Sequence, residues 1–274
     1  MSLETARTEH LDIGDVRFAF RRLGATAGTP LLLLQHFTGT MDSWDPEVVN
    51  CIAESRPVIA FNNLGIGSST GRTPDTVEQM AADARSFIQG LDLPTVDLLG
   101  FSLGSMLAQV LAAQHPDLIR KIIIAGAAPR GGEEHLVEVV GEAFAVAGPD
   151  VRLPLFFTPT EESQRAGRAF VARAMARKEN RDPDGGDDIS EPQAKAIIGW
   201  CASKEEDQAT LRAIAQPALV VHGSDDTMFP SINAYNMFKA MRNAQLLLYP
   251  DAGHGALFQY PERFVTHCRT FLDE

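Results

Sequence analysis

The chain has 274 residues, of which 45% are hydrophobic and 22% charged, so it can bury a sizeable core in one large α/β domain or two smaller ones. Its formal net charge of −12 disfavours binding to the phosphate backbone of nucleic acids. No apolar run approaches the ~18 residues that span a bilayer, and the polar N-terminus lacks the apolar region of a secretory signal, so we expect a cytoplasmic protein without membrane contacts.

The first predicted element is an antiparallel pair of strands, because hydrophobic residues alternate with polar ones along residues 11–24. Six apolar runs of strand length follow, and their apolar character on both faces suits a parallel sheet that helices cover on both sides. These runs lie at residues 30–36, 57–61, 95–100, 121–126, 218–223 and 244–250. Helical patterns separate them at about 45–54, 76–91, 103–115, 231–242 and 259–272. The order predicts a doubly wound α/β fold with a mostly parallel, eight-stranded sheet.

The connection that follows the run at 121–126 is far longer than a helical crossover requires. Helical patterns occur inside it at 133–147, 162–180 and 191–202. These patterns predict a helical lid over one end of the sheet, so we divide the chain into a core of residues 1–130 and 216–274 and a lid of residues 131–215. Within the lid, the stretch 180–188 is rich in Asp, Gly and Pro and predicts an exposed loop.

Two stretches match the nucleophile motif Gly-x-Ser-x-Gly: residues 100–104, which read GFSLG, and residues 67–71, which read GSSTG. A nucleophile on this motif needs a sharp turn between a strand and a helix, which the glycines permit and which directs helix N–H groups at a developing anion. Ser102 follows a predicted strand and precedes a helical pattern, whereas Ser69 lies in a glycine-rich loop. The context therefore selects Ser102 as the nucleophile.

A serine nucleophile needs a base, and the base needs an orienting carboxylate. Among seven histidines, His254 stands out because it follows the last predicted strand between two glycines, in a loop that we expect to be flexible. Asp225 and Asp226 follow the run at 218–223; periodicity does not choose between them, and capping the next helix is the alternative role. Ser102, the acidic pair and His254 all follow strands, so we expect them to meet at the carboxyl edge of the sheet.

With these residues, the chain resembles the serine-dependent α/β-hydrolases with a helical lid, over nearly its whole length. The family's nucleophile motif corresponds to GFSLG around Ser102, and its Gly-His motif corresponds to residues 253–254. The acid motif Gly-x-x-Asp-x-x-x-Pro matches residues 223–230 and selects Asp226 over Asp225. The resemblance implies an α/β-hydrolase fold with the lid inserted after the sixth strand, and the chain order Ser, Asp, His.

The loop after the first buried strand departs from the family, which usually reads His-Gly-Phe-x-Gly where this chain has Gln-His-Phe-Thr-Gly at 35–39. The resemblance implies an oxyanion hole formed by the backbone N–H groups of Phe37 and Leu103. His36 stands where the family has glycine; it either packs under the loop, or lines the pocket or orients a water molecule. Asn62 replaces an aspartate that is common in the family's next glycine-rich loop, and we interpret that loop as structural.

The resemblance implies acyl transfer to water through an acyl-enzyme on Ser102, without a metal or an organic cofactor. Three cysteines far apart in the sequence favour reduced thiols and have no metal-ligand spacing. The glycines at 65–71 are spaced one residue too widely for a dinucleotide site. We expect a small-molecule ester or lactone as the partner, and a homodimer as one expected assembly.

A fairly apolar pocket for a small to medium substrate is expected between lid and core, although the same side chains would also serve as packing between the two. The candidate lining residues are His36, Trp44, Met106, Phe144, Leu155, Phe156, Phe157 and Trp200. The stretch GFSLGSMLAQ is similar to the motif of enol-lactonases of aromatic degradation. The alternatives are carbon–carbon bond hydrolysis of a diketone, a cofactor-free haloperoxidase or perhydrolase, and a ligand-binding receptor on a hydrolase scaffold with little turnover.

Overall fold

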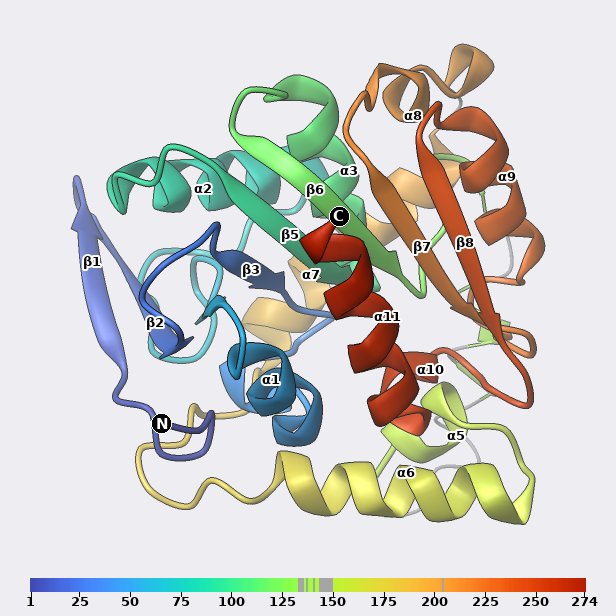
Figure 1. Cartoon of the computed structure of the whole chain (residues 1–274), viewed down its shortest axis with the longest axis horizontal. Helices are drawn as coiled ribbons and strands as arrows, with labels where there is room; N and C mark the ends of the chain where they lie inside the picture. The colour runs from blue at the N-terminus through green and yellow to red at the C-terminus, as the bar shows by residue number, and fades with distance from the viewer. Residues whose placement is uncertain (133–135, 137, 140, 143–149, 204) are drawn as a thin grey trace.

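The structure is a computed structural model that describes residues 1–274 apart from 133–135, 137, 140, 143–149 and 204. An eight-stranded sheet in the order β1-β2-β4-β3-β5-β6-β7-β8 crosses its centre (Figure 1). Strand β2 pairs antiparallel with β1 and β4, and all other neighbouring strands are parallel, as the sequence predicts. The strands are β1 Glu9–Ile13, β2 Val16–Gly24, β3 Leu31–Leu34, β4 Pro57–Phe61, β5 Val96–Phe101, β6 Ile119–Ala125, β7 Ala218–Gly223 and β8 Ala244–Tyr249.

Consecutive residues of the central strands face opposite sides of the sheet, and both sides are buried. On β3, Leu32 and Leu34 belong to one hydrophobic core, whereas Leu31 and Leu33 belong to the other. A strand that is covered on both faces has no solvent side, which explains why its sequence is continuously apolar instead of alternating.

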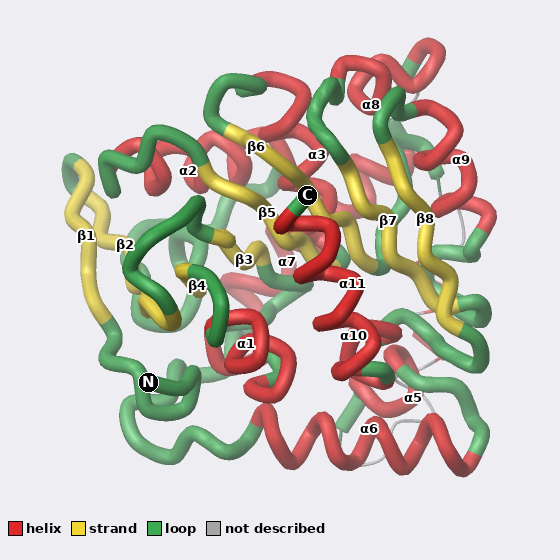
Figure 2. The backbone as a smooth tube through the Cα atoms, in the orientation of Figure 1, coloured by secondary structure: helices red, strands yellow, loops and turns green. Residues whose placement is uncertain are grey.

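Helices cover both faces of the sheet (Figure 2). Helices α1, α10 and α11 bury their apolar residues in one core, and α2, α3, α8 and α9 bury theirs in the other. Their bounds are α1 Pro46–Ala53, α2 Val77–Gly90, α3 Leu103–Gln114, α8 Ala209–Ala213, α9 Ile232–Ala240, α10 Ala256–Gln259 and α11 Pro261–Asp273. The pattern at 259–272 corresponds to α11, which has Pro261 at its first position, and the short helix α10 precedes it.

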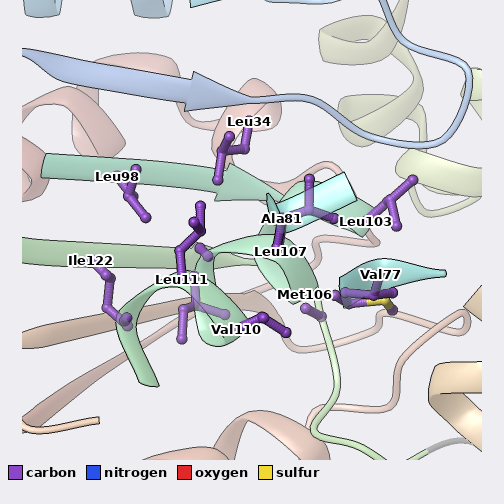
Figure 3. Close-up of a cluster of buried hydrophobic side chains, with 14 of the residues drawn as sticks. Leu34, Val77, Ala81, Leu98, Leu103, Met106, Leu107, Val110, Leu111 and Ile122 are labelled. Carbon is purple, nitrogen blue, oxygen red and sulfur yellow. The ribbon is translucent and has the colours of Figure 1, made fainter. Parts of the chain in front are cut away.

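Helix α3 contributes buried side chains along its whole length to the core that it shares with α2, α8 and α9. Figure 3 shows Leu107 and Leu111 of this helix beside Leu98 of β5 and Ile122 of β6. Buried residues occur on almost every side of α3, so this helix is enclosed between the sheet and the neighbouring helices. This packing fixes the direction in which the first turn of α3 points.

The connection between β6 and β7, which we call the insertion, contains most of the helices that the lid prediction requires. Its described helices before α8 are α5 Arg152–Phe156, α6 Glu161–Ala174, α7 Asp187–Ala202 and the short 3₁₀ turn Glu206–Gln208. The helix predicted at 133–147 lies largely outside the described residues. Among the helices that the structure describes, none is both long and apolar enough to cross a bilayer.

The stretch 180–188 is largely the exposed loop that its composition predicts, but one of its residues departs from that prediction. Asp182 is buried, and its carboxylate accepts hydrogen bonds from Asn62 Nδ2 at 2.9 Å and from the Ser68 N–H at 3.0 Å. Helix α7 already begins at Asp187. The carboxylate is buried because the glycine-rich loop after β4 supplies the donors that compensate for its lost hydration.

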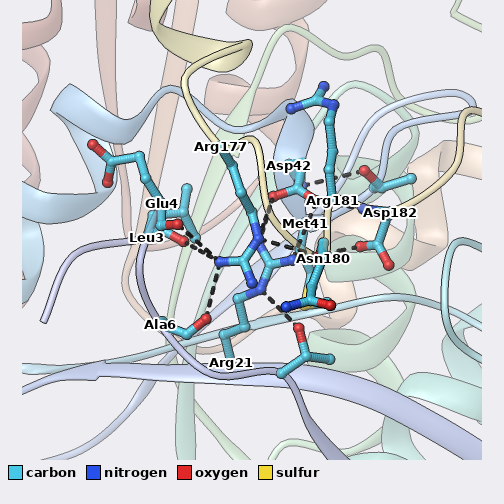
Figure 4. A network of polar contacts seen from close by, with 12 residues as sticks. Leu3, Glu4, Ala6, Arg21, Met41, Asp42, Arg177, Asn180, Arg181 and Asp182 are labelled. Carbon is cyan, nitrogen blue, oxygen red and sulfur yellow. Dashed lines mark hydrogen bonds and ion pairs between the residues drawn. The ribbon is translucent and has the colours of Figure 1, made fainter.

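A buried network of charged groups joins the insertion to the N-terminal part of the chain (Figure 4). Arg21 on β2 donates to both carboxylate oxygens of Asp42, at 2.6 and 3.1 Å, and the N–H of Asp182 donates to the same carboxylate at 2.8 Å. Arg177, after α6, donates to three backbone carbonyls within residues 3–6. The connector between α6 and α7 is therefore fixed to the core by hydrogen bonds.

Replacing Asp42 by alanine is expected to lower the free energy of unfolding by about 3–5 kcal/mol, because it leaves the Arg21 guanidinium buried without its closest carboxylate. The urea midpoint, followed by circular dichroism, measures this loss. Asp12→Ala removes a carboxylate from an exposed pair with Arg17 and is the control that should leave the midpoint unchanged. Equal midpoints for the two variants would contradict the stabilising role of the buried pair.

Candidate active site

Ser102 occupies a sharp turn between the end of β5 and the start of α3. Its backbone has φ 54° and ψ −118°, a conformation that residues other than glycine rarely adopt. A Cβ atom on Gly104 would lie 2.0 Å from the carbonyl oxygen of Leu34, and one on Gly100 would lie 2.4 Å from the carbonyl oxygen of Gly104. The two glycines of the motif therefore permit the close packing that holds Ser102 in this conformation.

Ser69, in the second match to the motif, has a different environment. Its buried hydroxyl donates to the carbonyl of Asn62 and accepts from the N–H of Ala19, both at 2.9 Å. The side chain thus joins the loop after β4 to strand β2, and its hydroxyl is fully used in doing so.

Ser102 and His254 line one cavity of about 470 Å³, which the sheet edge and the insertion enclose together. Its apolar wall comprises Phe37, Leu136, Val151, Leu155, Phe156, Ala194, Ile197, Ile198, Met228 and Phe229. Its other polar side chains are His36, Thr38, Ser43, Asp150, Arg152 and Asp184. A larger groove of about 740 Å³ lies beside residues 22–30 and 93–95, but no histidine, cysteine or carboxylate is among the described residues that line it. The smaller cavity is therefore the candidate active site.

Of the eight predicted lining residues, His36, Leu155 and Phe156 line this cavity. Phe144 lies outside the described residues. The structure corrects the prediction for the four others, which are buried away from the cavity: Trp44, Met106, Phe157 and Trp200.

Each of these four side chains packs in the protein interior instead. Trp44 packs against α10, and Met106 lies in the core that α3 forms with the sheet. Phe157 packs against α6, and Trp200 Nε1 donates to the carbonyl of Ala128 at 3.2 Å. Large apolar residues of a lid and of its core look alike in sequence whether they face a ligand or each other, and this explains the error.

His254 and Asp226 form a buried pair, in which His254 Nδ1 lies 2.9 Å from Asp226 Oδ2. The other oxygen of Asp226 accepts from the N–H groups of Met228 and Phe229, at 2.9 and 3.0 Å. One carboxylate therefore holds the turn after β7 and orients the imidazole. Asp225 is exposed, and neither acid caps α9, so the helix-cap alternative does not apply.

Asp226 has a second imidazole neighbour, His222, whose role the sequence does not reveal. His222 lies on β7 with its side chain buried, and its Nε2 is 2.6 Å from the Phe229 carbonyl oxygen and 3.2 Å from Asp226 Oδ2. Since a carbonyl only accepts hydrogen bonds, Nε2 carries the proton and directs it at both oxygens. The residue is visible four positions before the acid, but as part of an apolar strand pattern it gives no sign of a polar partner.

The surroundings of Asp226 keep it ionised. Burial alone would raise the pKa of Asp226, but the electrostatic interaction with His254 and the hydrogen bonds from both histidines hold that pKa well below its usual value. Burial likewise opposes the charged form of His222, yet its hydrogen bond to Asp226 and the charge of that carboxylate raise the pKa of His222 overall. A carboxylate that stays charged at neutral pH is what an orienting partner of His254 requires.

The loop at residues 36–39 leaves one backbone donor unused. Three of its four N–H groups have acceptors at 2.6–3.0 Å: the side chain of Gln35, the side chain of Gln193 and a carbonyl of the loop itself. The N–H of Phe37 has no acceptor among the described residues. Leu103 is the first residue of α3, where a backbone N–H has no intrahelical acceptor. The two donors that the family resemblance implies are thus available at this edge of the sheet.

His36 both packs under this loop and lines the cavity. Its ring stands edge-on to Phe101 and Phe156, with ring centroids 5.5 and 5.4 Å apart. Burial lowers the pKa of His36 to about 3, so the ring is neutral at neutral pH. Its Nδ1 lies 2.8 Å from the carbonyl oxygen of Phe37 and donates to it.

The chain belongs to the alpha/beta hydrolase fold family, whose sequence model matches residues 29–261. The solved structure of an alpha/beta hydrolase fold protein from Chitinophaga pinensis is 40% identical and superposes over 100% of both chains with a TM-score of 0.95. A protein of Mycobacterium tuberculosis that is provisionally named a non-heme bromoperoxidase is 29% identical over 89% of this chain and 94% of its own length. A poly(3-hydroxyalkanoate) depolymerase of Ectopseudomonas oleovorans is 28% identical over 98% of this chain and 92% of its own length.

Because folding lowers the pKa of Asp226, its charge stabilises the native protein above the pKa of the unfolded chain, ~3.9, and this stabilisation is lost as the pH falls below that value. We expect Asp226→Asn to lower the free energy of unfolding at neutral pH by about 1–3 kcal/mol, the loss of a hydrogen bond to a charged group. The difference from the wild type should shrink below about pH 4.

Urea titrations from neutral pH down to about pH 3 test this expectation. The neighbouring exposed carboxylate provides the control, because Asp225→Asn removes no contact with either imidazole and should leave the free energy of unfolding at neutral pH nearly unchanged. A stability difference for Asp226→Asn that stays constant over the whole range would contradict the lowered pKa.

Proposed function

We propose that the protein is a serine hydrolase that cleaves a carboxylic ester or lactone through an acyl-enzyme on Ser102. One observation carries the proposal. Ser102, in its strained conformation, lines the same cavity as His254, and His254 Nδ1 lies 2.9 Å from Asp226 Oδ2. Phe37 lines the same cavity, and its N–H, which has no acceptor among the described residues, would supply the electrostatic stabilisation that acyl transfer needs.

In the proposed reaction, Ser102 Oγ attacks the carbonyl carbon while His254 Nε2 takes the hydroxyl proton. The N–H groups of Phe37 and Leu103 bind the resulting oxyanion, and each such donor is typically worth ~3 kcal/mol of transition-state stabilisation. His254 then gives its proton to the leaving oxygen, and the acyl group stays on Ser102. A water molecule, deprotonated by His254, attacks the acyl carbon and releases the acid and the free serine.

The cavity supports a substrate of limited size. Its volume of about 470 Å³ falls in the range of small-molecule pockets, about 300–1,000 Å³. The wall is mostly apolar, while Asp150, Arg152 and Asp184 supply its charged groups. A relative named as a depolymerase of a polyester adds support for ester bonds. The lactone part of the proposal rests on the similarity of GFSLGSMLAQ to the enol-lactonase motif.

Replacing Ser102 by alanine is expected to reduce the hydrolysis of p-nitrophenyl acetate and butyrate by about 10⁴-fold or more, because the variant lacks the hydroxyl that attacks the carbonyl carbon. The same variant should lose covalent labelling by a fluorophosphonate. Ser69→Ala is the matched control, and it should keep the label because its hydroxyl only serves the fold. A wild-type protein that shows no burst and no serine-dependent turnover would refute the proposed hydrolase activity and favour the alternative of a ligand-binding receptor.

The choice between ester and lactone needs its own experiment. Rates on a panel of lactones, measured beside those on matched open-chain esters, separate the two substrate classes.

The provisional name of the Mycobacterium tuberculosis relative favours one second candidate, a cofactor-free perhydrolase. In that reaction, hydrogen peroxide instead of water attacks the acyl group on Ser102, and the peracid that leaves oxidises bromide. Bromination in a mixture of acetate, peroxide and bromide tests it. A bromination rate that depends on Ser102 and exceeds the rate of ester hydrolysis would favour the perhydrolase over the hydrolase as the function of the protein.

A further inference from the structure

The peptide group between Phe37 and Thr38 is held at both of its ends. Its carbonyl oxygen accepts from Nδ1 of His36 at 2.8 Å, and its N–H donates to Oε1 of Gln193 at 2.6 Å. His36 belongs to the loop itself, whereas Gln193 lies on α7 of the insertion and is buried. Two side chains that are 157 positions apart (193 − 36) therefore fix the orientation of a single peptide plane.

The preceding peptide group, which carries the unused N–H of Phe37, is fixed as well. Its carbonyl belongs to His36 and accepts from the N–H of Gly39 at 3.0 Å. With the peptide groups on both sides held, the two backbone torsion angles of Phe37 have little freedom, and the direction of its N–H is set.

The loop needs this support because its conformation is not one that the sequence prefers. Thr38 has φ 56°, in the left-handed region that β-branched residues avoid. A free loop would relax toward ordinary torsion angles and turn the neighbouring peptide groups with it. Contacts from outside the loop are what keep such a conformation populated.

We propose that His36 and Gln193 are positioning residues that together aim the N–H of Phe37 at the reacting carbonyl oxygen, so that the insertion completes the oxyanion hole. This inference rests on the proposed hydrolase function. It also gives His36 a reason to replace the family's glycine: its imidazole supplies the donor that fixes the Phe37 carbonyl, and being neutral it does so without adding a charge beside the oxyanion.

The test compares two substitutions of Gln193. Gln193→Leu keeps the size of the side chain but removes the acceptor, whereas Gln193→Glu keeps an oxygen that Thr38 N–H can reach. The readouts are kcat and KM for p-nitrophenyl butyrate, the urea midpoint, and the affinity for phenylboronic acid, whose boron bonds to Ser102 Oγ and places an oxygen where the oxyanion forms. Gln216→Leu is the matched control, because Gln216 is also buried and donates to the carbonyl of Ala112, away from the cavity.

We expect Gln193→Leu to lower kcat and the boronate affinity in parallel by roughly 10- to 100-fold, somewhat less than the loss of a whole oxyanion-hole donor, with KM changed by less than about threefold. Gln193→Glu should keep most of the wild-type kcat and most of the wild-type boronate affinity. Gln216→Leu should lower the urea midpoint but leave kcat unchanged.

A second variant covers the case in which Gln193→Leu does not fold. His36→Phe keeps the ring that packs on Phe101 and Phe156 but lacks the donor, and it should lower kcat and boronate affinity in the same way. Because both side chains hold one peptide group, the double variant should lose less than the product of the two single losses.

The outcomes separate the inference from the function on which it rests. An active wild type whose Gln193→Leu and His36→Phe variants lose only stability, with unchanged kcat and boronate affinity, would overturn the positioning role alone. A wild type that neither hydrolyses esters nor binds phenylboronic acid would overturn the proposed function and the positioning role together.

Discussion

Backbone groups in the loops at the carboxyl edge of the sheet need hydrogen-bond partners once helices bury them, and the insertion provides those partners. The side chain of Gln193 accepts from the loop after β3, and that of Asp182 accepts from the loop after β4. The carbonyl of Phe156 accepts from the N–H of Gly255, in the loop after β8, at 2.9 Å. Two of the loops that line the candidate site, those after β3 and β8, thus depend on a group from the segment between β6 and β7, and this segment lines the cavity itself.

Phe156 illustrates the consequence for His254. Its ring lies between two imidazoles, with centroids 5.4 Å from His36 and 5.6 Å from His254. A Cβ on Gly253 or Gly255 would lie 2.9 or 2.8 Å from atoms of Phe156. The glycines on either side of His254 are therefore required by the close approach of α5. This corrects our expectation that the loop around His254 is flexible.

The parts of the structure that the sequence predicts are those with a local cause. Leu31–Leu34 form a buried strand because four consecutive leucines suit a sheet that is covered on both sides. Ser102 differs from Ser69 because a strand precedes it and a helix follows it, and both signals lie within a few residues of the motif. The acid motif likewise spans one turn, so it distinguishes Asp226 from Asp225.

The parts that the sequence does not predict are contacts between distant segments. Gln193 sits in an ordinary helical pattern, and nothing near it indicates that its amide oxygen meets the N–H of Thr38. Asp182 lies among residues that are typical of exposed loops, and only its contacts with Asn62 and Ser68 explain its burial. Such pairings follow from how the insertion folds back on the sheet, which no local pattern encodes.

Asn62 shows how the charges of the buried network constrain a single residue. Its Oδ1 accepts from the N–H of Met41 at 2.8 Å, and its Nδ2 donates to Asp182. An aspartate, common at this position in the family, could accept the first bond but could not donate the second. The two buried carboxylates of the network, Asp42 and Asp182, are balanced by the guanidinium groups of Arg21 and Arg177. A third carboxylate beside them would lack a cation, so the neutral amide is the group that lets Asp182 connect the insertion to the loop after β4.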